Sequence, residues 1–396
     1  MKIILAGVGC GTQATMTQAV ASALAQADLI IGAPRLLRGL SGFSARLDSA
    51  ISPDEILRLF ESISPSRCCV VFSGDTGFYS GAKSLIPLLE AHGIESEVMP
   101  GISSVAFFAA ALGRPWQDWV LCSAHGVPCD PVSAVMCGRP VCFLTGGNQG
   151  PDGLCRTLCD VGLSALPVIV GENLSYPQQR IHSMTALEAS RQHFAPLSIL
   201  LTEAAPLYPR RAAGFPDDLF LREQVPMTKQ LVRASILALL APEQEDICWD
   251  VGSGTGSVSV ELSLHAKRVY AVERRPQAAA LTRKNREIFC CWNMSVLEGS
   301  APDCLHQLPP PDKVFIGGSG GALAEIVETA ISRNPRVRIL VSAIALETLE
   351  QARHSLQQAG CVVSVHQLSV SRSDSVAGLT MMRGENPIFL IVGQRP

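Results

Sequence analysis

A glycine-rich run between two regular segments carries the residues whose types and spacing first suggest chemistry. The chain reads D-V-G-S-G-T-G from Asp250 to Gly256, after the apolar segment 247–249 and before a helix pattern at 257–262. A strand, a glycine turn and a helix in this order bring backbone N–H groups close to a ligand. Glycines at alternate positions omit the Cβ atoms that would keep the ligand away. The binding residues predicted here are Gly252, Ser253, Gly254, Thr255 and Gly256.

An acidic residue ends the next predicted strand. Glu273 follows the segment 268–272 and lies about twenty residues past the glycine turn. At this spacing a carboxylate can accept hydrogen bonds from a ribose diol. The third glycine of the turn comes one residue too early for the dinucleotide fingerprint G-x-G-x-x-G, which disfavours a dehydrogenase. A tight turn that binds no ligand stays open as the alternative.

Composition limits the class of protein. The 396 residues are 47% hydrophobic and 17% charged, enough to bury the cores of two or three domains. A net charge of −3 argues against a broad nucleic-acid-binding face. No apolar run has the length of a membrane span, and the chain starts without a secretory h-region, so we expect a cytoplasmic protein with no membrane partner.

Cysteine and histidine usage gives no sign of a metal site. The fourteen cysteines are scattered, none of them in a C-x-x-C pattern, and pairs such as Cys68-Cys69 and Cys290-Cys291 lie in apolar runs. Cysteine in such runs behaves as a small hydrophobe, so we expect reduced core residues. The eight histidines show no ligand spacing.

The first half of the chain alternates between strand and helix patterns, which predicts an α/β domain over residues 1–205. The predicted strands are 2–8, 29–32, 67–73, 97–99, 120–123, 141–145, 167–171 and 197–201. The predicted helices are 18–27, 53–62, 81–92, 101–111 and 151–161.

Candidate ligand-contacting residues lie where these strands end or the next helix begins. Asp75 stands at the carboxyl end of a parallel strand, where ligands bind in open α/β sheets. Ser103 and Ser104 open a helix, a position in which capping is the commoner role. His125 is a candidate acid–base group, although a histidine at a strand end is more often structural. The full set is Gly9, Gly11, Asp75, Gly77, Ser103, Ser104, His125 and Glu172.

Short motifs in this half resemble those of the tetrapyrrole methylases, the class III methyltransferases that use S-adenosylmethionine (SAM). They are G-x-G-x-G at 7–11, S-G-D-x-G-F-Y at 73–79, P-G-x-S-S at 100–104 and S-x-H-G at 123–126. The resemblance implies that SAM folds into a cleft between two αβ subdomains. It places Gly9 and Gly11 on the tetrapyrrole side of that cleft and Glu172 beside the bound SAM.

Periodicity is lost between residues 206 and 225, a stretch with several prolines that we predict to be a linker. The remainder, 226–396, alternates again and predicts a doubly wound, Rossmann-like α/β domain whose last two strands are antiparallel. The predicted strands are 247–251, 268–272, 295–298, 313–316, 337–343, 361–368 and 387–393. The predicted helices are 230–240, 257–265, 276–289, 302–307, 321–332 and 346–359.

The motifs of this second half resemble the decarboxylating precorrin methyltransferase domain, a class I SAM methyltransferase. They are T-K at 228–229, the glycine turn, E-G-S-A-P at 298–302, F-I-G-G-S-G-G at 315–321 and an S-R…N-P run that starts at Ser371. The resemblance implies that Thr228, Glu273, Ser300 and Ala301 contact SAM. The family usually has an acid where this chain has Ser300, so the contact can pass to the main chain at Ala301.

Two further groups concern the substrate. The glycines after the fourth strand leave room for a large flat molecule, and the residues expected to face it are Gly317, Gly318, Ser319 and Gly320. Arg372 is a candidate partner for substrate carboxylates, with a solvated surface arginine as an equally good interpretation.

Together the two resemblances imply a bifunctional enzyme of cobalamin biosynthesis that binds one SAM per domain, acts on a precorrin, a tetrapyrrole, and forms a homo-oligomer. They imply methylation at C5 by the first domain, methylation at C15 by the second, and loss of CO₂ from the ring C acetate. One alternative is a methyltransferase acting on RNA or protein, which the absence of an N-P-P-Y-type run disfavours. Another is a non-catalytic SAM-binding regulator, which two complete SAM-type sites disfavour.

Overall fold

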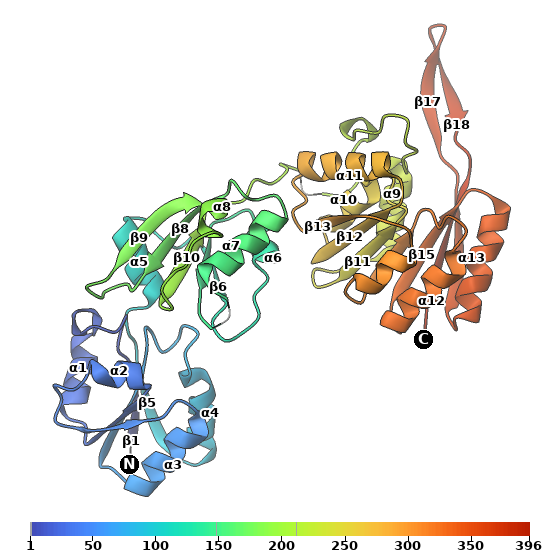
Figure 1. Ribbon diagram of the computed structural model, residues 1–396. Helices are drawn as coiled ribbons and strands as arrows, with labels where there is room; N and C mark the ends of the chain where they lie inside the picture. The colour runs from blue at the N-terminus through green and yellow to red at the C-terminus, as the bar shows by residue number, and fades with distance from the viewer. Residues whose placement is uncertain (1, 148, 211) are drawn as a thin grey trace. The chain divides into compact units, whose positions relative to one another are not determined.

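The computed structural model describes residues 2–147, 149–210 and 212–396, and its chain forms two compact units (Figure 1). The first unit comprises residues 1–135 and 139–205, and the second comprises 136–138 and 206–396. Both are α/β, as the alternating patterns predicted. In the described part of the chain, no helix is long and apolar enough to cross a membrane.

The first unit begins with a five-stranded parallel sheet in the order β3-β2-β4-β1-β5. Its strands are β1 (Lys2–Gly7), β2 (Leu29–Gly32), β3 (Arg46–Ser49), β4 (Arg67–Phe72) and β5 (Glu95–Met99). The accompanying helices are α1 (Gln18–Ala25), α2 (Pro34–Arg38), α3 (Pro53–Ile63) and α4 (Ala82–Ala91). Alternate residues of the strands enter opposite sides of the core, so that Ile3 packs in one cluster and Ala6 in another.

A second five-stranded sheet completes this unit, in the mixed order β6-β7-β10-β8-β9. Its strands are β6 (Val120–Ser123), β7 (Val141–Leu144), β8 (Pro167–Glu172), β9 (Arg180–Thr185) and β10 (Ser198–Thr202). The helices are α5 (Ser104–Leu112), α6 (Pro131–Val135), α7 (Pro151–Asp160) and α8 (Ala186–Ala189). Phe108 of α5 is completely buried against this sheet.

The second unit is built on a seven-stranded sheet in the order β13-β12-β11-β14-β15-β19-β16. Its strands are β11 (Ile247–Val251), β12 (Arg268–Glu273), β13 (Met294–Glu298), β14 (Lys313–Ile316), β15 (Arg338–Ala343), β16 (Val362–Leu368) and β19 (Ile388–Gln394). The helices are α9 (Gln230–Leu240), α10 (Ser257–Ser263), α11 (Pro276–Ile288), α12 (Leu323–Arg333) and α13 (Leu346–Gln358). Strand β19 is antiparallel to both its neighbours, which confirms the predicted antiparallel end of the sheet.

The segment predicted to be a linker packs against the second unit. Residues 206–225 belong to the second unit, where Phe215 and Phe220 are buried in the core. The indole N–H of Trp292 also donates to the carbonyl of Pro206 at 2.7 Å. The sequence did not indicate this packing, because the few buried aromatic residues of the segment follow neither a helix period nor a strand period.

Some elements escaped prediction because they bury little. Strands β3 and β9 are edge strands with few or no fully buried residues. A hairpin of β17 (Ser371–Val376) and β18 (Leu379–Gly384) extends away from the sheet of its unit (Figure 1). Without a buried face, such strands lack the alternating pattern from which strands are predicted.

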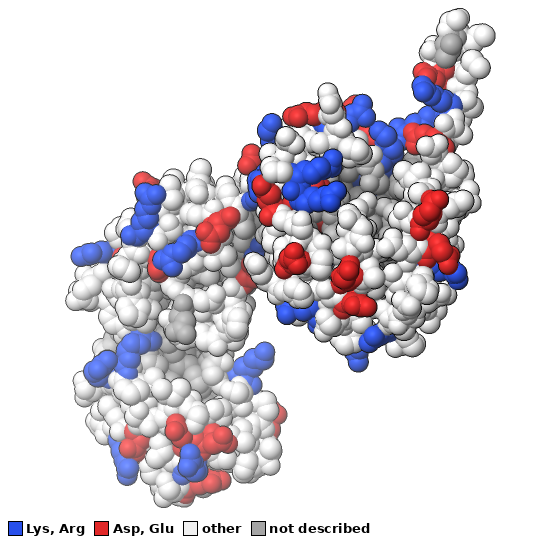
Figure 2. Space-filling model, turned by 45° about the vertical axis from the view of Figure 1, so that its right-hand side comes forward, with Lys and Arg blue, Asp and Glu red and all other residues white. Residues whose placement is uncertain are grey.

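Charged side chains of both signs are interspersed on the face shown in Figure 2. Several of the cysteines lie in the core, as Cys68 and Cys142 do. Burial raises the pKa of the Cys69 thiol to about 11, which keeps it protonated and unreactive.

Candidate functional site

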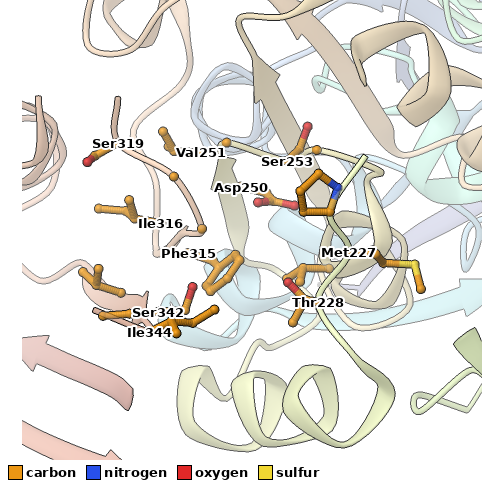
Figure 3. Close-up of a pocket in the computed structure, with 18 of the residues that line it drawn as sticks. Met227, Thr228, Asp250, Val251, Ser253, Phe315, Ile316, Ser319, Ser342 and Ile344 are labelled. Carbon is orange, nitrogen blue, oxygen red and sulfur yellow. The ribbon is translucent and has the colours of Figure 1, made fainter. Parts of the chain in front are cut away.

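A cavity of about 1180 Å³ lies in the second unit, at the carboxyl ends of its central parallel strands. Residues that end or follow β11, β12, β14 and β15 line it. Figure 3 shows side chains from separate segments, among them Thr228, Asp250 and Phe315, around the same space. This is the edge at which open α/β sheets bind ligands.

The glycine turn forms one wall of this cavity. Gly252 and Gly254 have φ angles of 76° and 58°, in the left-handed region that favours glycine. A Cβ atom on Gly252 would lie 2.7 Å from the backbone nitrogen of Gly318, so the two loops approach each other directly. Gly256, also predicted to bind the ligand, does not line the cavity. Its missing Cβ instead makes room for Thr282, whose Cγ2 would lie 2.6 Å away.

Glu273 is buried at the end of β12 and lines the cavity. Its Oε2 accepts a hydrogen bond from the N–H of Gly254 at 2.9 Å, and its Oε1 accepts one from the N–H of Arg275 at 2.9 Å. Oε1 also accepts from Nε of Arg275 at 3.3 Å, so Oε2 is the oxygen that keeps a further lone pair. The carboxylate therefore fixes the glycine turn and still has acceptor capacity for ligand hydroxyls.

Three buried polar atoms of the glycine turn have no hydrogen-bond partner among the described residues. They are Oδ1 of Asp250, Oγ of Ser253 and Oγ1 of Thr255, and all three residues line the cavity. An unpaired buried polar atom costs about 1–3 kcal/mol. A polar ligand that offered donors and acceptors here would remove this cost, so the turn fits a nucleoside-containing ligand.

Burial also sets the charge state of Asp250. Loss of solvation raises the pKa of its carboxyl from 3.8 to about 7, while the hydrogen bond donated by the Ser259 hydroxyl acts in the opposite direction. The nearby charge of Glu273 contributes to the rise in this pKa.

The segment that carries Thr228 is held by a buried cation. The guanidinium of Arg233, on α9, is completely buried and donates to the carbonyl of Thr228 at 2.6 Å. It also pairs with Glu261 and Asp217, each at 2.8 Å. This network positions the Thr228 segment along the cavity, where sequence reasoning expected Thr228 but did not identify Arg233.

Other predicted residues of this unit divide between the cavity and the surface. Those found on the cavity wall are Ser300, Ala301, Gly317, Gly318, Ser319 and Gly320. Arg372 does not line the cavity; it lies on β17 and pairs with Asp217 at 3.4 Å and Glu385 at 3.2 Å. The cationic residues on the wall are Lys229, which the sequence analysis named only as part of the T-K motif, and three arginines that it did not name: Arg274, Arg275 and Arg383. Arg274 and Arg275 directly follow Glu273, and this position in the sequence could have indicated that they lie at the site.

The first unit has a cavity of about 390 Å³. Its wall is formed by residues that follow β2, β4, β6, β7 and β8, together with the start of α5. The candidate residues Asp75, Ser103, Ser104 and His125 lie on this wall. Asp75 accepts hydrogen bonds from the N–H groups of Gly77 (2.8 Å) and Gly101 (2.9 Å), so it joins two loops. Ser103 caps α5 by accepting from the N–H of Ala106 at 3.1 Å.

Four predicted residues lie outside this wall, and each has a structural role. Gly9 pairs with Gly74 in an isolated bridge, and a Cβ on Gly11 would lie 2.0 Å from the Tyr176 hydroxyl. Gly77 bonds Asp75 through its N–H. Glu172 accepts from the N–H of Ala195 at 2.6 Å and is bonded to His182 at 3.0 Å. The wall residues that the sequence analysis missed include Arg35 and Tyr176.

No group of three or more His, Cys, Asp or Glu side chains that could hold a metal ion occurs among the described residues.

Comparison with known proteins accounts for both units. A family model described as Tetrapyrrole (Corrin/Porphyrin) Methylases matches residues 2–189, and one described as Precorrin methyltransferase domain matches 218–395. The precorrin-6Y C(5,15)-methyltransferase [decarboxylating] of Sinorhizobium sp is 30% identical over 332 residues, 82% of this chain and 79% of that protein. The chain belongs to the family of the decarboxylating precorrin-6Y C5,15-methyltransferases.

Members of this methyltransferase family use SAM as the methyl donor. The 332 aligned residues exceed the length of either unit, so the similarity extends over both. A second relative, the probable cobalt-precorrin-6B C(15)-methyltransferase (decarboxylating) of Pyrobaculum calidifontis, is 39% identical over 46% of this chain and 97% of its own length. A solved precorrin-6Y C5,15-methyltransferase from Geobacter metallireducens is 35% identical over 46% of this chain and 97% of its own, with a TM-score of 0.45.

Proposed function

We propose that this chain methylates a precorrin at C5 and C15 and removes the carboxyl group of the ring C acetate as CO₂. The observation that carries the proposal is the alignment over 82% of the chain with a relative whose name states both methylations and the decarboxylation. The tetrapyrrole methylase match lies in the first unit, so we assign C5 to it. The precorrin methyltransferase match lies in the second, to which we assign C15 and the decarboxylation.

Each unit would bind one SAM molecule. In the second unit, Glu273 would accept hydrogen bonds from the ribose, and the unpaired oxygens of Asp250, Ser253 and Thr255 would meet the polar groups of the ligand. Thr228, Ser300 and Ala301 would complete the contacts. In the first unit, Asp75, Ser103 and Ser104 would lie beside SAM, because they form the cavity wall.

SAM supplies an activated methyl group on a sulfonium, which needs little help from protein side chains. The residues of each cavity must therefore hold the reacting carbon in line and keep water out. The loop 317–320 gives the second cavity space for a flat macrocycle, because it has almost no side chains. Lys229, Arg274 and Arg383 would pair with the carboxylates of the substrate.

The roles of individual residues stay predictions. His125 is a candidate acid–base group because it lies on the first cavity wall with an exposed imidazole. Arg372 is less well placed for substrate, since its two acidic partners already neutralise it. A cytoplasmic location is expected from the sequence composition, and self-association is expected from the resemblance. Light scattering of the purified chain would test the self-association.

The deciding experiment is to incubate the full chain with SAM and precorrin-6Y and to determine the product by mass spectrometry and NMR. We expect a gain of two methyl groups, at C5 and C15, with loss of one CO₂. A product methylated only at C5 would refute the active site assigned to the second unit, and a product methylated only at C15 would refute the one assigned to the first. An unchanged tetrapyrrole in the presence of bound SAM would refute the proposed substrate.

A further inference from the structure

The cavity of the first unit contains an arginine that the proposed reaction has not used. Arg35 follows β2 and lies on α2, and its side chain lines the cavity together with Ser73 and Tyr176. Its Nη1 donates to the Tyr176 hydroxyl at 3.1 Å, and its Nη2 donates to the Ser73 hydroxyl at 3.2 Å. Residues from two separate loops, after β4 and after β8, therefore hold the guanidinium in place.

Both of these partners are neutral, so they orient the guanidinium without neutralising it. No carboxylate forms an ion pair with Arg35 within the described ranges 2–147, 149–210 and 212–396. The one acidic residue that the described part of this wall contains is Asp75, and it accepts the N–H groups of Gly77 and Gly101. An arginine has five N–H donors, of which these contacts use two.

Further contacts of Tyr176 fix the position of the hydroxyl that Arg35 contacts. The Tyr176 hydroxyl lies so close to Gly11 that a Cβ there would be 2.0 Å from it. Tyr176 in turn belongs to the turn after β8, where its N–H donates to the carbonyl of Asn173 at 3.0 Å. The loop after β1 and the turn after β8 therefore both restrict the position of the Tyr176 hydroxyl, which orients the Arg35 guanidinium.

We infer that Arg35 is a carboxylate-binding residue of the first cavity. An arginine held by neutral acceptors, with free donors on a cavity wall, matches the two oxygens of a carboxylate in a bidentate pair. The choice of ligand rests on the proposed function, which supplies two carboxylates: the methionine moiety of SAM and the acidic side chains of the tetrapyrrole. The chemistry is the same in both cases, and experiment separates them.

The test uses the full chain in three forms: wild type, Arg35→Ala and Arg38→Ala. Arg38 lies on the same helix, is exposed and does not line the cavity, so it is the matched control. Calorimetry measures the binding of S-adenosylhomocysteine, of methylthioadenosine, which lacks the carboxylate, and of precorrin-6Y. Rates of C5 and C15 methylation are followed in parallel, with C15 as the internal control for an intact second unit.

If Arg35 binds the cofactor carboxylate, Arg35→Ala weakens S-adenosylhomocysteine about tenfold or more and leaves methylthioadenosine unchanged. If it binds the tetrapyrrole, the same variant weakens precorrin-6Y by a similar factor and leaves both nucleosides unchanged. Arg35→Lys, which keeps the charge but loses the fork, should recover part of the affinity, and Arg38→Ala should resemble wild type.

Unchanged affinity for all three ligands in Arg35→Ala would overturn the inference, as would an equal loss for methylthioadenosine. The proposed function fails separately. If the wild type transfers no methyl to C5, the proposed reaction is refuted. If Arg35→Ala still binds a carboxylate ligand more weakly than the wild type does, the carboxylate site stands.

Discussion

The N–H of Gly254 donates to Oε2 of Glu273 across 2.9 Å, so the glycine turn after β11 and the acid that ends β12 form one structural unit. Gly254 lies in the turn after β11, and Glu273 is the last residue of β12, the parallel strand beside it. Because the carboxylate also lines the cavity, a change at Glu273 should alter both the cavity wall and the glycine turn.

Glu273→Gln should raise the KM for SAM in C15 methylation about tenfold, because the amide loses the charge-assisted hydrogen bonds to the ribose hydroxyls. The kcat should change little, since the ribose is bound equally in the ground and transition states. Glu298→Gln is the control: it lies opposite Glu273 in the register of β12 and β13 but outside the cavity. Equal KM values for both variants would contradict the role given to Glu273.

Gly252→Ala should lower the melting temperature of the second unit by several degrees and abolish C15 methylation. The new Cβ would lie 2.6–2.8 Å from atoms of Gly318, at a φ of 76° that alanine rarely adopts. Such backbone strain costs on the order of 1–3 kcal/mol. Gly318→Ala is the informative comparison, because its Cβ would meet only Cα of Gly252, at 3.9 Å. Calorimetric melting should show a stable Gly318→Ala chain; equal destabilisation of the two would refute this explanation.

The stability of the second unit should fall as the pH rises from about 4 to about 7. In this range the folded state keeps the proton on Asp250, whose pKa is raised to about 7, while the unfolded state releases it with a pKa of 3.8. The native state therefore binds more protons than the unfolded state, and the loss is on the order of 4 kcal/mol across the window.

Urea unfolding of wild type and Asp250→Asn at pH 5 and pH 8 measures this contribution. The asparagine variant should lose the part of the pH dependence that Asp250 causes, whereas Asp303→Asn, a change at an exposed carboxylate, should retain it. Identical pH slopes in wild type and Asp250→Asn would show that Asp250 is ionised in the folded chain throughout.

Removal of the buried cation Arg233 should be far more damaging than removal of the exposed Arg372. Arg233→Ala leaves Glu261, which is completely buried, without its cationic partner, and such a loss costs about 3–5 kcal/mol. Arg372→Ala breaks pairs in which the arginine is 42% exposed, so the cost should stay below about 1 kcal/mol. Chemical denaturation measures the free energy of unfolding of both variants. Similar decreases in the two would refute the larger contribution of Arg233 to stability.

The same network also holds Thr228, which lines the cavity, through its carbonyl, 2.6 Å from the Arg233 guanidinium. Arg233→Lys keeps a charge but cannot reach Glu261, Asp217 and Thr228 with one fork. We expect it to fold and to raise the KM for SAM in C15 methylation severalfold, with C5 methylation unchanged. A parallel loss of both methylations would indicate general destabilisation and contradict a positioning role.

The local sequence pattern was enough to predict the strands and helices beside each glycine turn. The motif from Asp250 to Gly256 and the acid Glu273 lie within a single β–α–β segment, where strand period, glycine content and chain spacing determine the geometry. For the same reason the sequence placed Asp75, Ser103 and His125 at strand or helix ends, and the structure finds them on one cavity wall.

Tertiary structure alone decided which of the candidates share a cavity and what else joins them. Glu172 is turned toward His182 and Ala195, and Arg372 pairs with Asp217, 155 residues away in the sequence. Arg35 reaches Tyr176 across 141 residues, and Arg233 is buried beside Asp217 and Glu261. Such long-range partners follow from how sheets and loops pack rather than from any local period, so neither charge nor spacing along the chain predicts them.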